Sequence, residues 1–364
     1  MPLPTTAAPV AQAKVGDREP NQLIITTGSM AQAQKVTTLM RAKGARIKSR
    51  KNLEALNLVI SVFRLTASDN PQSIIDTIGR EFPKAVVDAN HRYHLLNDPN
   101  ALSSIKAWSL TSIGRHTGRA RCIATKAIGV LDTLSATDHP ALIGAKVTNQ
   151  NFTGREQPAN TNHGTALAVL LTGNQPSQFA SLIPGSEIKV AGVFREDHNG
   201  QSTTLEFLLY GLNWLVSENV GVINLSLGGA NNRVLAHAFK QAMEKNIVLV
   251  AAAGNGGSKA PPTYPAALPG VIAVTAIDAA GLLYPYANRG SYIDIAAPGV
   301  DIWAANENGT GAYQSGTSYA AAFVSAYAAV FGKPADWSTV SKDLGDTGKD
   351  NNFGWGLLRW QPCQ

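Results

Sequence analysis

Residues 248–257, VLVAAAGNGG, decide the fold of the larger part of this chain and point to its chemistry. The first residues are apolar and rich in valine, which predicts a short buried strand. Three alanines and a glycine end that strand before Asn255, whose side-chain amide can donate a hydrogen bond to an oxyanion. Asn-Gly pairs are also common in ordinary turns, so a purely structural interpretation of this segment stays open.

Short apolar strands of the same kind are expected at residues 126–131, 188–194, 220–225, 247–252 and 271–277. Amphipathic helices separate them, and the clearest helix lies between the second and third strands. Strands that alternate with helices predict a parallel sheet with helices on both faces. We therefore expect an α/β domain over residues 97–364.

A smaller unit precedes this domain. Residues 1–20 are rich in Pro and Ala and are expected to form a flexible tail. Residues 21–96 predict the order strand, helix, strand, strand, helix, strand, which is that of an α+β ferredoxin-like module. The predicted strands are 23–27, 47–53, 56–65 and 85–89, and the predicted helices are 30–43 and 70–82.

Composition and charge argue against two classes of function. The 364 residues have a net charge of +6, but residues 1–96 contain 13 basic and 7 acidic groups, whereas residues 97–364 contain 18 of each. The larger part is thus neutral, which gives no support to nucleic-acid binding. No apolar run reaches the roughly 18 residues that a membrane-spanning helix needs, so we expect no membrane span.

The cellular compartment is less clearly marked. Cys122 and Cys363 flank the larger segment, and both one disulfide and two unpaired thiols are compatible with this spacing. Ala11-Gln12-Ala13 has the form of a signal-peptidase site, which is consistent with the tail of an export leader.

Three further segments place reactive side chains at a strand end or a helix start. AIGVLDT (residues 127–133) ends a strand at Asp132, NTNHGTALAVLLTG (160–173) has His163 in the first turn of a helix, and SGTSYAAAFVSAYAAVFG (315–332) has Ser318 at a helix start. Each has a structural alternative, as a turn cap, a structural histidine or an N-cap. A nucleophile at a helix start, however, has backbone N–H groups and the positive dipole end beside it.

Together these segments resemble the subtilisin-like serine proteases (subtilases) that are made with a propeptide. The order Asp132, His163, Ser318 is the order of that family, and the gaps of 31 and 155 residues are similar. The likeness covers residues 108–358. It includes HPALIGAKV (139–147), INLSLGG (223–229), DIAAPGVDIWA (294–304) and LGDTGKDNNFGWGLL (344–358).

The resemblance implies a serine endopeptidase with a defined set of site residues. Ser318 would be the nucleophile, His163 the general base, Asp132 the group that orients it, and Asn255 the oxyanion donor. No acidic residue is seen in the implied pocket for the residue before the scissile bond, so we expect cleavage after apolar residues. The implied substrate-binding residues are Ser226, Leu227 and Gly228, which would pair with the substrate backbone, and Ala252, Ala253, Gly254 and Thr263, which would line the pocket.

The resemblance also implies that the enzyme is made as an autoinhibited zymogen. Residues 21–96 would be its inhibitory propeptide, with autocleavage after Leu96, or alternatively after Leu95. Tyr93 would then lie four positions before the bond. We expect a monomer that acts on polypeptides and is secreted or periplasmic.

Several positions depart from the family pattern. They are Leu134, Ala166, Tyr319 and Ala322, where the family usually has Gly, His, Met and Pro. The last change affects the helix of the nucleophile. It therefore keeps open a catalytically impaired peptide-binding homologue and a transpeptidase or peptide cyclase on the same fold. Residues 170–188 lack the family's calcium loop, so we expect no metal there, and no cofactor.

Overall fold

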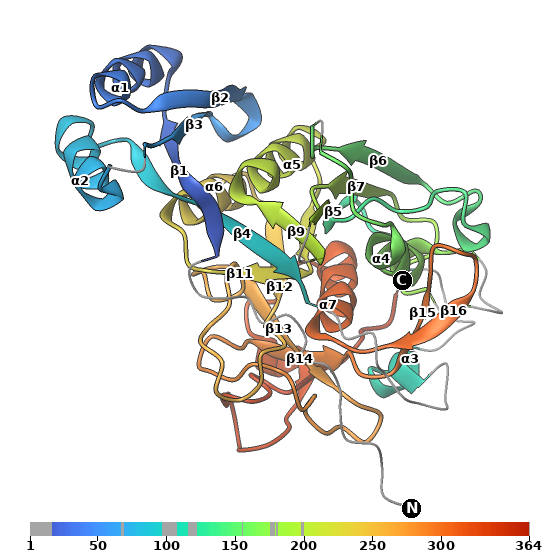
Figure 1. The fold of residues 1–364 in the computed structure, drawn as a ribbon. Helices are drawn as coiled ribbons and strands as arrows, with labels where there is room; N and C mark the ends of the chain where they lie inside the picture. Colours follow the sequence, from blue (N-terminus) through green and yellow to red (C-terminus); the bar gives the residue numbers. More distant parts are fainter. Residues whose placement is uncertain are drawn as a thin grey trace, which may run out of the picture.

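The computed structural model describes residues 17–66, 69–96, 108–115, 122–154, 156–174, 179, 181–197 and 200–363. Within them, an N-terminal unit of residues 17–96 packs against a larger unit that contains the parallel sheet (Figure 1). Residues 1–16 of the expected tail lie outside the described residues.

The N-terminal unit has the predicted element order. Its strands form an antiparallel sheet in the order β2-β3-β1-β4, and Ser29 and Asn70 cap the two helices with their side chains. This confirms the small α+β fold expected ahead of the parallel sheet. The elements are β1 (Arg18–Thr27), α1 (Met30–Ala42), β2 (Arg46–Leu53), η1 (Glu54–Leu56), β3 (Leu58–Arg64), α2 (Pro71–Glu81) and β4 (Val86–Leu95).

Two strands of this unit are longer than the sequence predicts. β1 begins at Arg18, within the expected tail, and there Arg18 lies opposite His91. β4 continues to Leu95 rather than ending at residue 89. The extension of β1 is polar, and that of β4 has only Tyr93 and Leu95 among polar residues, so their apolar pattern is short, and contacts with the rest of the chain stabilise both.

The larger unit has a nine-stranded sheet in the order β17-β18-β14-β13-β12-β10-β5-β7-β6. From β14 to β6 every neighbouring pair is parallel. Its elements are α3 (Trp108–Ser112), β5 (Ile128–Asp132), η2 (Pro140–Leu142), β6 (Val147–Asn151), α4 (Asn162–Thr172), β7 (Ile188–Gly192), β8 (Arg195–Asp197), β9 (Gly200–Thr204), α5 (Leu205–Ser217), β10 (Val222–Leu225), β11 (Leu227–Gly229), α6 (Arg233–Met243), β12 (Val248–Ala252), β13 (Ile272–Ile277), β14 (Ile295–Pro298), β15 (Ile302–Ala305), β16 (Gly311–Gln314), α7 (Thr317–Phe331), η3 (Trp337–Val340), β17 (Ser341–Lys342) and β18 (Leu357–Leu358).

Helices cover both faces of this sheet, as predicted. In β12, Val250 packs into the same buried cluster as α4 and α7, whereas Leu249 and Ala251 pack into the cluster of α5 and α6. Successive side chains of a strand point to opposite faces, so a strand that is buried on both sides reads as a continuous apolar run.

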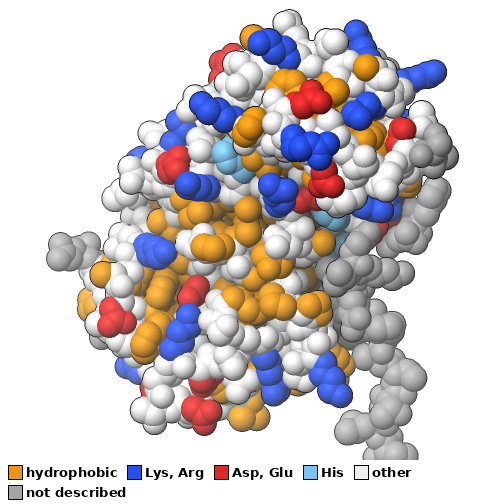
Figure 2. Space-filling model, turned by 90° about the vertical axis from the view of Figure 1, so that its left-hand side faces the viewer, with side chains coloured by type: hydrophobic (Ala, Val, Ile, Leu, Met, Phe, Trp, Pro, Cys, Tyr) orange, Lys and Arg blue, Asp and Glu red, His pale blue; other side chains and the backbone are white. Residues whose placement is uncertain are grey.

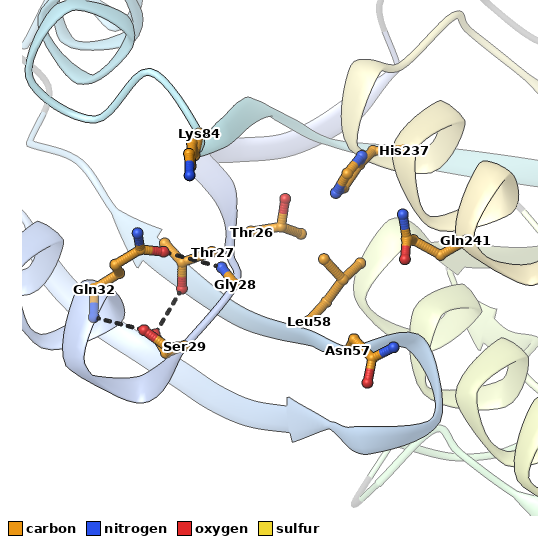
Figure 3. Close-up of a pocket in the computed structure, with 10 residues that line it drawn as sticks. All are labelled: Thr26, Thr27, Gly28, Ser29, Gln32, Asn57, Leu58, Lys84, His237 and Gln241. Atoms are coloured by element: carbon orange, nitrogen blue, oxygen red, sulfur yellow. Dashed lines mark hydrogen bonds between the residues drawn. The ribbon is translucent and has the colours of Figure 1, made fainter.

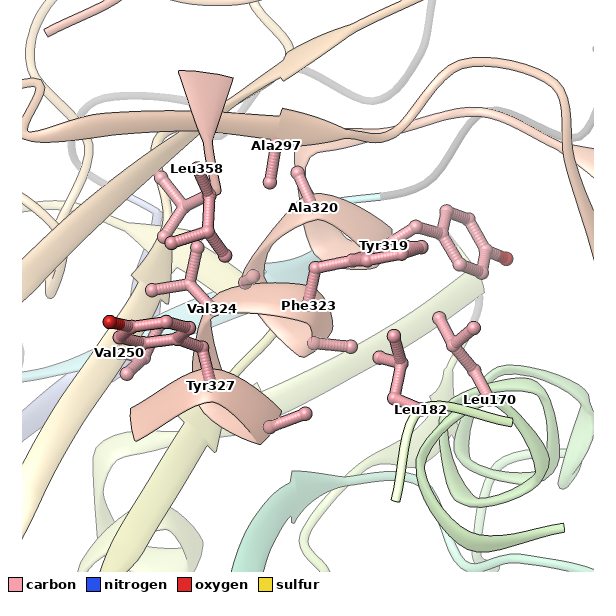
Figure 4. Packing of buried hydrophobic residues seen from close by; sticks show 14 of the residues in the cluster. Leu170, Leu182, Val250, Ala297, Tyr319, Ala320, Phe323, Val324, Tyr327 and Leu358 are labelled. Atoms are coloured by element: carbon pink, nitrogen blue, oxygen red, sulfur yellow. The ribbon is translucent and has the colours of Figure 1, made fainter. Parts of the chain in front are cut away.

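Helix α7 is buried along most of its length. Residues 317–328 are all buried, and Figure 4 shows Phe323 and Val324 packed among side chains from the sheet and from other segments, including Leu182 and Val250. The small alanines between the larger side chains let this helix approach the sheet closely. Its first turn is thereby held firmly at the carboxyl edge of the sheet.

The surface agrees with the uneven charge of the sequence. On the face in Figure 2, many Lys and Arg side chains lie over the upper part, where Figure 1 places the N-terminal unit. In the described part of the chain, no helix combines the length and apolar character needed to cross a bilayer.

Candidate active site

The predicted reactive residues meet at the carboxyl edge of the parallel sheet. Asp132 is the last residue of β5, and Asn255 follows the end of β12. His163 and Ser318 lie in the first turns of α4 and α7. The carboxyl edge is where parallel α/β sheets gather functional groups.

Asp132 and His163 form a buried pair. His163 Nδ1 lies 2.7 Å from Asp132 Oδ1 and 2.9 Å from Oδ2, and Oδ1 also accepts the Thr133 N–H at 2.7 Å. A carboxylate oxygen accepts hydrogen bonds, so this pairing favours the imidazole tautomer that has its proton on Nδ1 and leaves the lone pair on Nε2. Nε2 is buried and has no hydrogen-bond partner among the described residues, so it is available as a base.

The Ser318 hydroxyl contacts the end of the N-terminal unit. Its Oγ lies 2.5 Å from the Leu96 carbonyl oxygen and 3.2 Å from the Ser226 carbonyl oxygen. Gly316, with a φ of 153°, makes the sharp entry into α7. A backbone carbonyl therefore lies directly at the hydroxyl predicted to be the nucleophile.

Asn255 presents a buried amide donor beside the first turn of α7. Its Oδ1 accepts the Thr317 N–H at 3.1 Å and the Thr317 hydroxyl at 2.8 Å, which fixes the orientation of the amide. Its Nδ2 is buried and lacks a partner in the described part of the chain. A buried donor without a partner requires an explanation, and an oxyanion that forms only during a reaction would provide one.

The strand β4 lies between two strands of the larger unit. On one side it pairs with β11, with Leu95 opposite Leu227 and Tyr93 opposite Gly229, and on the other side it pairs with β9. The Leu96 N–H adds a hydrogen bond of 3.3 Å to the Ser226 oxygen. The backbone pairing expected of residues 226–228 is therefore made with the chain's own residues 94–96.

The Leu96 side chain lies beside Gly228 and Thr263. A Cβ atom at Gly228 would stand 3.0 Å from Leu96 Cδ1 and 2.8 Å from Thr263 Cγ2, so only glycine leaves room there. Ala252 packs in the same buried cluster as Leu96. The surroundings shown for Leu96 are thus small or apolar, and none of these residues is charged.

Two other expected wall residues are held by different neighbours. The Ala253 carbonyl accepts the Tyr292 hydroxyl at 2.7 Å, and the Gly254 N–H donates to the Thr317 hydroxyl oxygen at 3.2 Å. Burial raises the pKa of Tyr292 to about 12, which keeps the donor protonated at neutral pH. Both contacts fix the turn that carries Asn255.

Neighbouring residues accommodate the departures from the family pattern. Leu134 occupies the space next to Gly192, where a Cβ would lie 2.4 Å from Leu134 Cδ2. Tyr319 is buried, and its ring centroid lies 6.0 Å from that of His163. Burial, together with the charge of Asp132, raises the pKa of Tyr319. Ala322 lies in the continuous helix α7 and is fully buried.

Polar contacts attach the N-terminal unit to helix α5. The buried Glu206, in the first turn of α5, accepts the Ser49 hydroxyl at 2.6 Å and the Tyr210 hydroxyl at 2.9 Å, and Lys48 Nζ lies 3.6 Å away. The Ala55 N–H also donates to Asn213 Oδ1 at 3.1 Å.

Helix α6 is held in a similar way at its N-terminus. Asp88 Oδ2 accepts the Arg233 N–H at 2.9 Å, a favourable place for a carboxylate. Asn232 caps the helix and donates from Nδ2 to His91 Nδ1 at 2.8 Å. Burial lowers the pKa of His91, partly offset by the charge of Asp88.

A third attachment is an ion cluster. Glu19 Oε1 lies 2.9 Å from Arg92 Nε and 2.5 Å from an Arg195 NH2 group, and Arg195 also pairs with Glu156 at 3.0 Å. Burial alone would raise the pKa of Glu19, but the hydrogen bond and charge of Arg92 and the charge of Arg195 lower it overall. The carboxylate is thus held in its ionised form.

A cavity of about 410 Å³ also lies between the two units (Figure 3). Lys84 borders it from the N-terminal unit, while His237 and Gln241 border it from α6. It is separate from the reactive residues and takes no part in their geometry.

Comparison with known families agrees with this site. The model of the subtilase family matches residues 125–356, which is more than half of the chain. The chain belongs to the subtilase family. As a subtilase it is a subtilisin-like serine endopeptidase, a hydrolase.

Similar subtilases come from Bacillus. The chain is 31% identical over 255 residues to subtilisin of Bacillus pumilus, covering 66% of this chain and 87% of that protein. It is 31% identical over 213 residues to the minor extracellular protease Epr of Bacillus subtilis (strain 168), covering 56% of this chain but only 33% of Epr.

Solved structures show the same fold. Fervidolysin from Fervidobacterium pennivorans, a keratinolytic enzyme related to subtilisin, matches with a TM-score of 0.74 and 22% identity, covering 94% of this chain and 60% of that one. The epidermin leader peptide processing serine protease from Staphylococcus aureus matches with a TM-score of 0.68 and 18% identity, covering 93% and 96%.

Some residues around the site of this subtilase were not predicted. Glu307, in the loop between β15 and β16, accepts the Thr161 N–H at 3.0 Å and the Thr161 hydroxyl at 2.9 Å through Oε2. It thereby caps the helix that carries His163. The second strand beside β4, β9, was also missed. Both lie in polar segments without a hydrophobic period, and only the Asn-Gly turn signal at residues 308–309 marks the loop.

Two open questions of the sequence concern the cysteines and metals. Cys122 and Cys363 form a disulfide, with their Cα atoms 5.4 Å apart. Among the described residues no group of three His, Cys, Asp or Glu side chains is arranged to hold a metal ion. Residues 175–178 and 180, in the segment predicted to lack calcium, lie outside the described residues, so that prediction stays untested.

Proposed function

We propose that this chain is a zymogen of a serine endopeptidase, in which residues 21–96 are an inhibitory propeptide that the enzyme cuts off after Leu96. One observation carries the proposal: the Leu96 carbonyl oxygen lies 2.5 Å from Ser318 Oγ while β4 is paired on both sides. This is the position that a scissile or newly cut bond would occupy. Leu95, the alternative, lies opposite Leu227, one residue too early.

The proposed mechanism uses two of the buried atoms that lack partners in the described part of the chain, His163 Nε2 and Asn255 Nδ2. The Ser318 hydroxyl turns from the Leu96 oxygen to His163 Nε2, which takes its proton as Oγ attacks the carbonyl carbon. Asp132 holds Nδ1–H and stabilises the imidazolium. The oxyanion accepts from Asn255 Nδ2 and the Ser318 N–H. His163 then gives the proton to the leaving amine, and water repeats the sequence on the acyl-enzyme.

We further propose cleavage after apolar residues of medium or large size. Leu96 lies beside Gly228 and Thr263 and shares a buried cluster with Ala252, and none of these three residues carries a charge that could pair with Lys or Arg. Unpaired charge is costly to bury, so charged residues are excluded. Secretion or export to the periplasm is proposed on the likeness to an extracellular protease and on the Ala11-Gln12-Ala13 segment.

Intact-mass measurement of the purified chain tests the proposal. The wild type is expected to lose residues 1–96 on incubation, whereas Ser318→Ala remains full length. Cleavage after Leu95 would instead release an N-terminal fragment that is one leucine shorter. Ser325→Ala is a matched control, because Ser325 is a buried serine of the same helix outside the reactive set, and it should still be processed.

Two other results would change the conclusion. If the wild type stays full length, as Ser318→Ala does, and a serine-directed fluorophosphonate labels neither of the two, the protease proposal falls and a peptide-binding role replaces it. If the wild type joins peptides to an added amine in preference to hydrolysis, a transpeptidase replaces the hydrolase.

A further inference from the structure

A cavity of about 340 Å³ opens beside His163. Its walls come from α4, β9, the hairpin β15–β16 and Tyr319 at the start of α7. Six of its eleven lining residues carry side-chain amides, and none is Lys, Arg, Asp or Glu. The amides belong to Asn160, Asn162, Gln201, Asn306, Asn308 and Gln314.

The position of the cavity suits the part of a substrate that follows the scissile bond. Residues up to Leu96 already have their places: Leu96 contacts Ser318, and Leu95 is buried in a different cluster. The cavity borders His163, which gives a proton to the leaving amine, and Gln314, which ends the strand leading into Ser318. A chain that continues past the scissile bond would therefore enter it.

We infer that this cavity receives the side chain of the residue after the scissile bond and selects uncharged polar side chains such as Asn, Gln, Ser and Thr. The inference rests on the proposed function and deepens it.

The six amides fall into two groups, three that are already engaged and three that are free to contact such a side chain. Asn160, Asn162 and Asn306 use their side-chain oxygens within the walls. In the described part of the chain, the side-chain amides of Gln201, Asn308 and Gln314 make no hydrogen bond with protein groups. Each offers an N–H donor and a carbonyl acceptor.

These free amides favour one class of side chain. A substrate amide or hydroxyl can satisfy both the donors and the acceptors, whereas an apolar side chain displaces water from them without replacing its hydrogen bonds. A charged side chain finds no opposite charge among the lining residues. Uncharged polar residues are thus preferred over both other classes.

The walls that carry the amides are fixed in place. Glu307, beside two of the lining asparagines, accepts two hydrogen bonds from Thr161 and donates its own N–H to Asn162 Oδ1 at 2.9 Å. The loop of the β15–β16 hairpin is therefore tied to the helix of His163. A loop whose backbone is fixed keeps the positions from which Asn308 and Gln314 reach the cavity, which favours discrimination between side chains.

A peptide series tests the inference. After self-processing, the enzyme is separated from its N-terminal unit and given quenched peptides that have Leu before the bond and differ only in the next residue. We expect kcat/KM with Asn or Gln to exceed that with Leu, Lys or Glu by about tenfold, given the partial exposure of the amides. Gln314→Leu should reduce the ratio of Gln to Leu to near one. Gln150→Leu, on the exposed edge strand β6, is the matched control and should keep the ratio.

The outcomes separate this inference from the proposed function. A Leu-anilide substrate has no residue after the cut, so its Ser318-dependent hydrolysis tests the nucleophile alone. If the anilide is hydrolysed but the peptide series shows no preference, or a preference for Leu, Lys or Glu, the inference is overturned and the protease stands. Retention of the ratio in Gln314→Leu would also overturn it.

Discussion

Gly229→Ala should selectively remove recognition of an aromatic residue four positions before the scissile bond. A Cβ at Gly229 would lie 2.3 Å from Tyr93 Cδ1 and 2.7 Å from Cε1, so the ring must leave its place. Tyr93 has no exposed surface there, and its hydroxyl reaches the Ala230 oxygen at 3.3 Å. Losing the burial of such a side chain costs about 1.5–3 kcal/mol, which is roughly 10- to 150-fold in kcat/KM.

The assay compares two peptides that have Leu before the bond and Tyr or Ala four positions before it. The variant should lose at least tenfold on the Tyr peptide and little on the Ala peptide. Self-processing should slow in Gly229→Ala and recover when Tyr93→Ala is added, because the smaller side chain no longer meets the new Cβ. An equal loss on both peptides would refute the reasoning, since it would show a general defect of the fold.

Three further outcomes are expected. Asn255→Ala should lower kcat by about 10² to 10³ with little change in KM, the loss known for removing the corresponding asparagine donor of a subtilisin. Replacing Cys122 and Cys363 by Ser should lower the free energy of unfolding, by up to about 5 kcal/mol from chain entropy for a loop of 241 residues, as denaturant titration would show. Because burial holds the pKa of His91 below 6.5, the native state binds fewer protons than the unfolded one. The stability of the Ser318→Ala chain should therefore fall as pH drops below 6.5, and His91→Gln should reduce this dependence in thermal melts between pH 5 and pH 8.

Burial explains why the fold and the reactive residues could be predicted from the sequence. Strands such as β12 and β13 are covered on both faces, so nearly every residue is apolar and the pattern survives without knowledge of the partners. The candidate site residues stand at or shortly after the ends of such strands, or at helix starts. Their places along the chain therefore follow from the same pattern, and the family likeness adds their roles.

The polar parts of the site could not be predicted in the same way. β9 has the sequence GQSTT, and it is a strand because β4 and β8 pair with it, which no local period records. Glu307 accepts a hydrogen bond from Thr161, which lies 146 residues earlier in the chain, so the contact depends wholly on the tertiary fold. The end of β4 could not be predicted for the same reason, because its extension to Leu95 depends on pairing with β9 and β11.

The contacts of the N-terminal unit bear on what cleavage after Leu96 would achieve. The ion cluster at Glu19, the hydrogen bonds of Ser49 to Glu206 and of Asp88 to the start of α6, and the pairing of β4 all involve residues before the proposed cut. Breaking the bond removes none of them. Under the proposed function, the first cut would thus leave β4 in the cleft and the enzyme inhibited. Release would require a separate step, such as a second cut within the N-terminal unit or its unfolding.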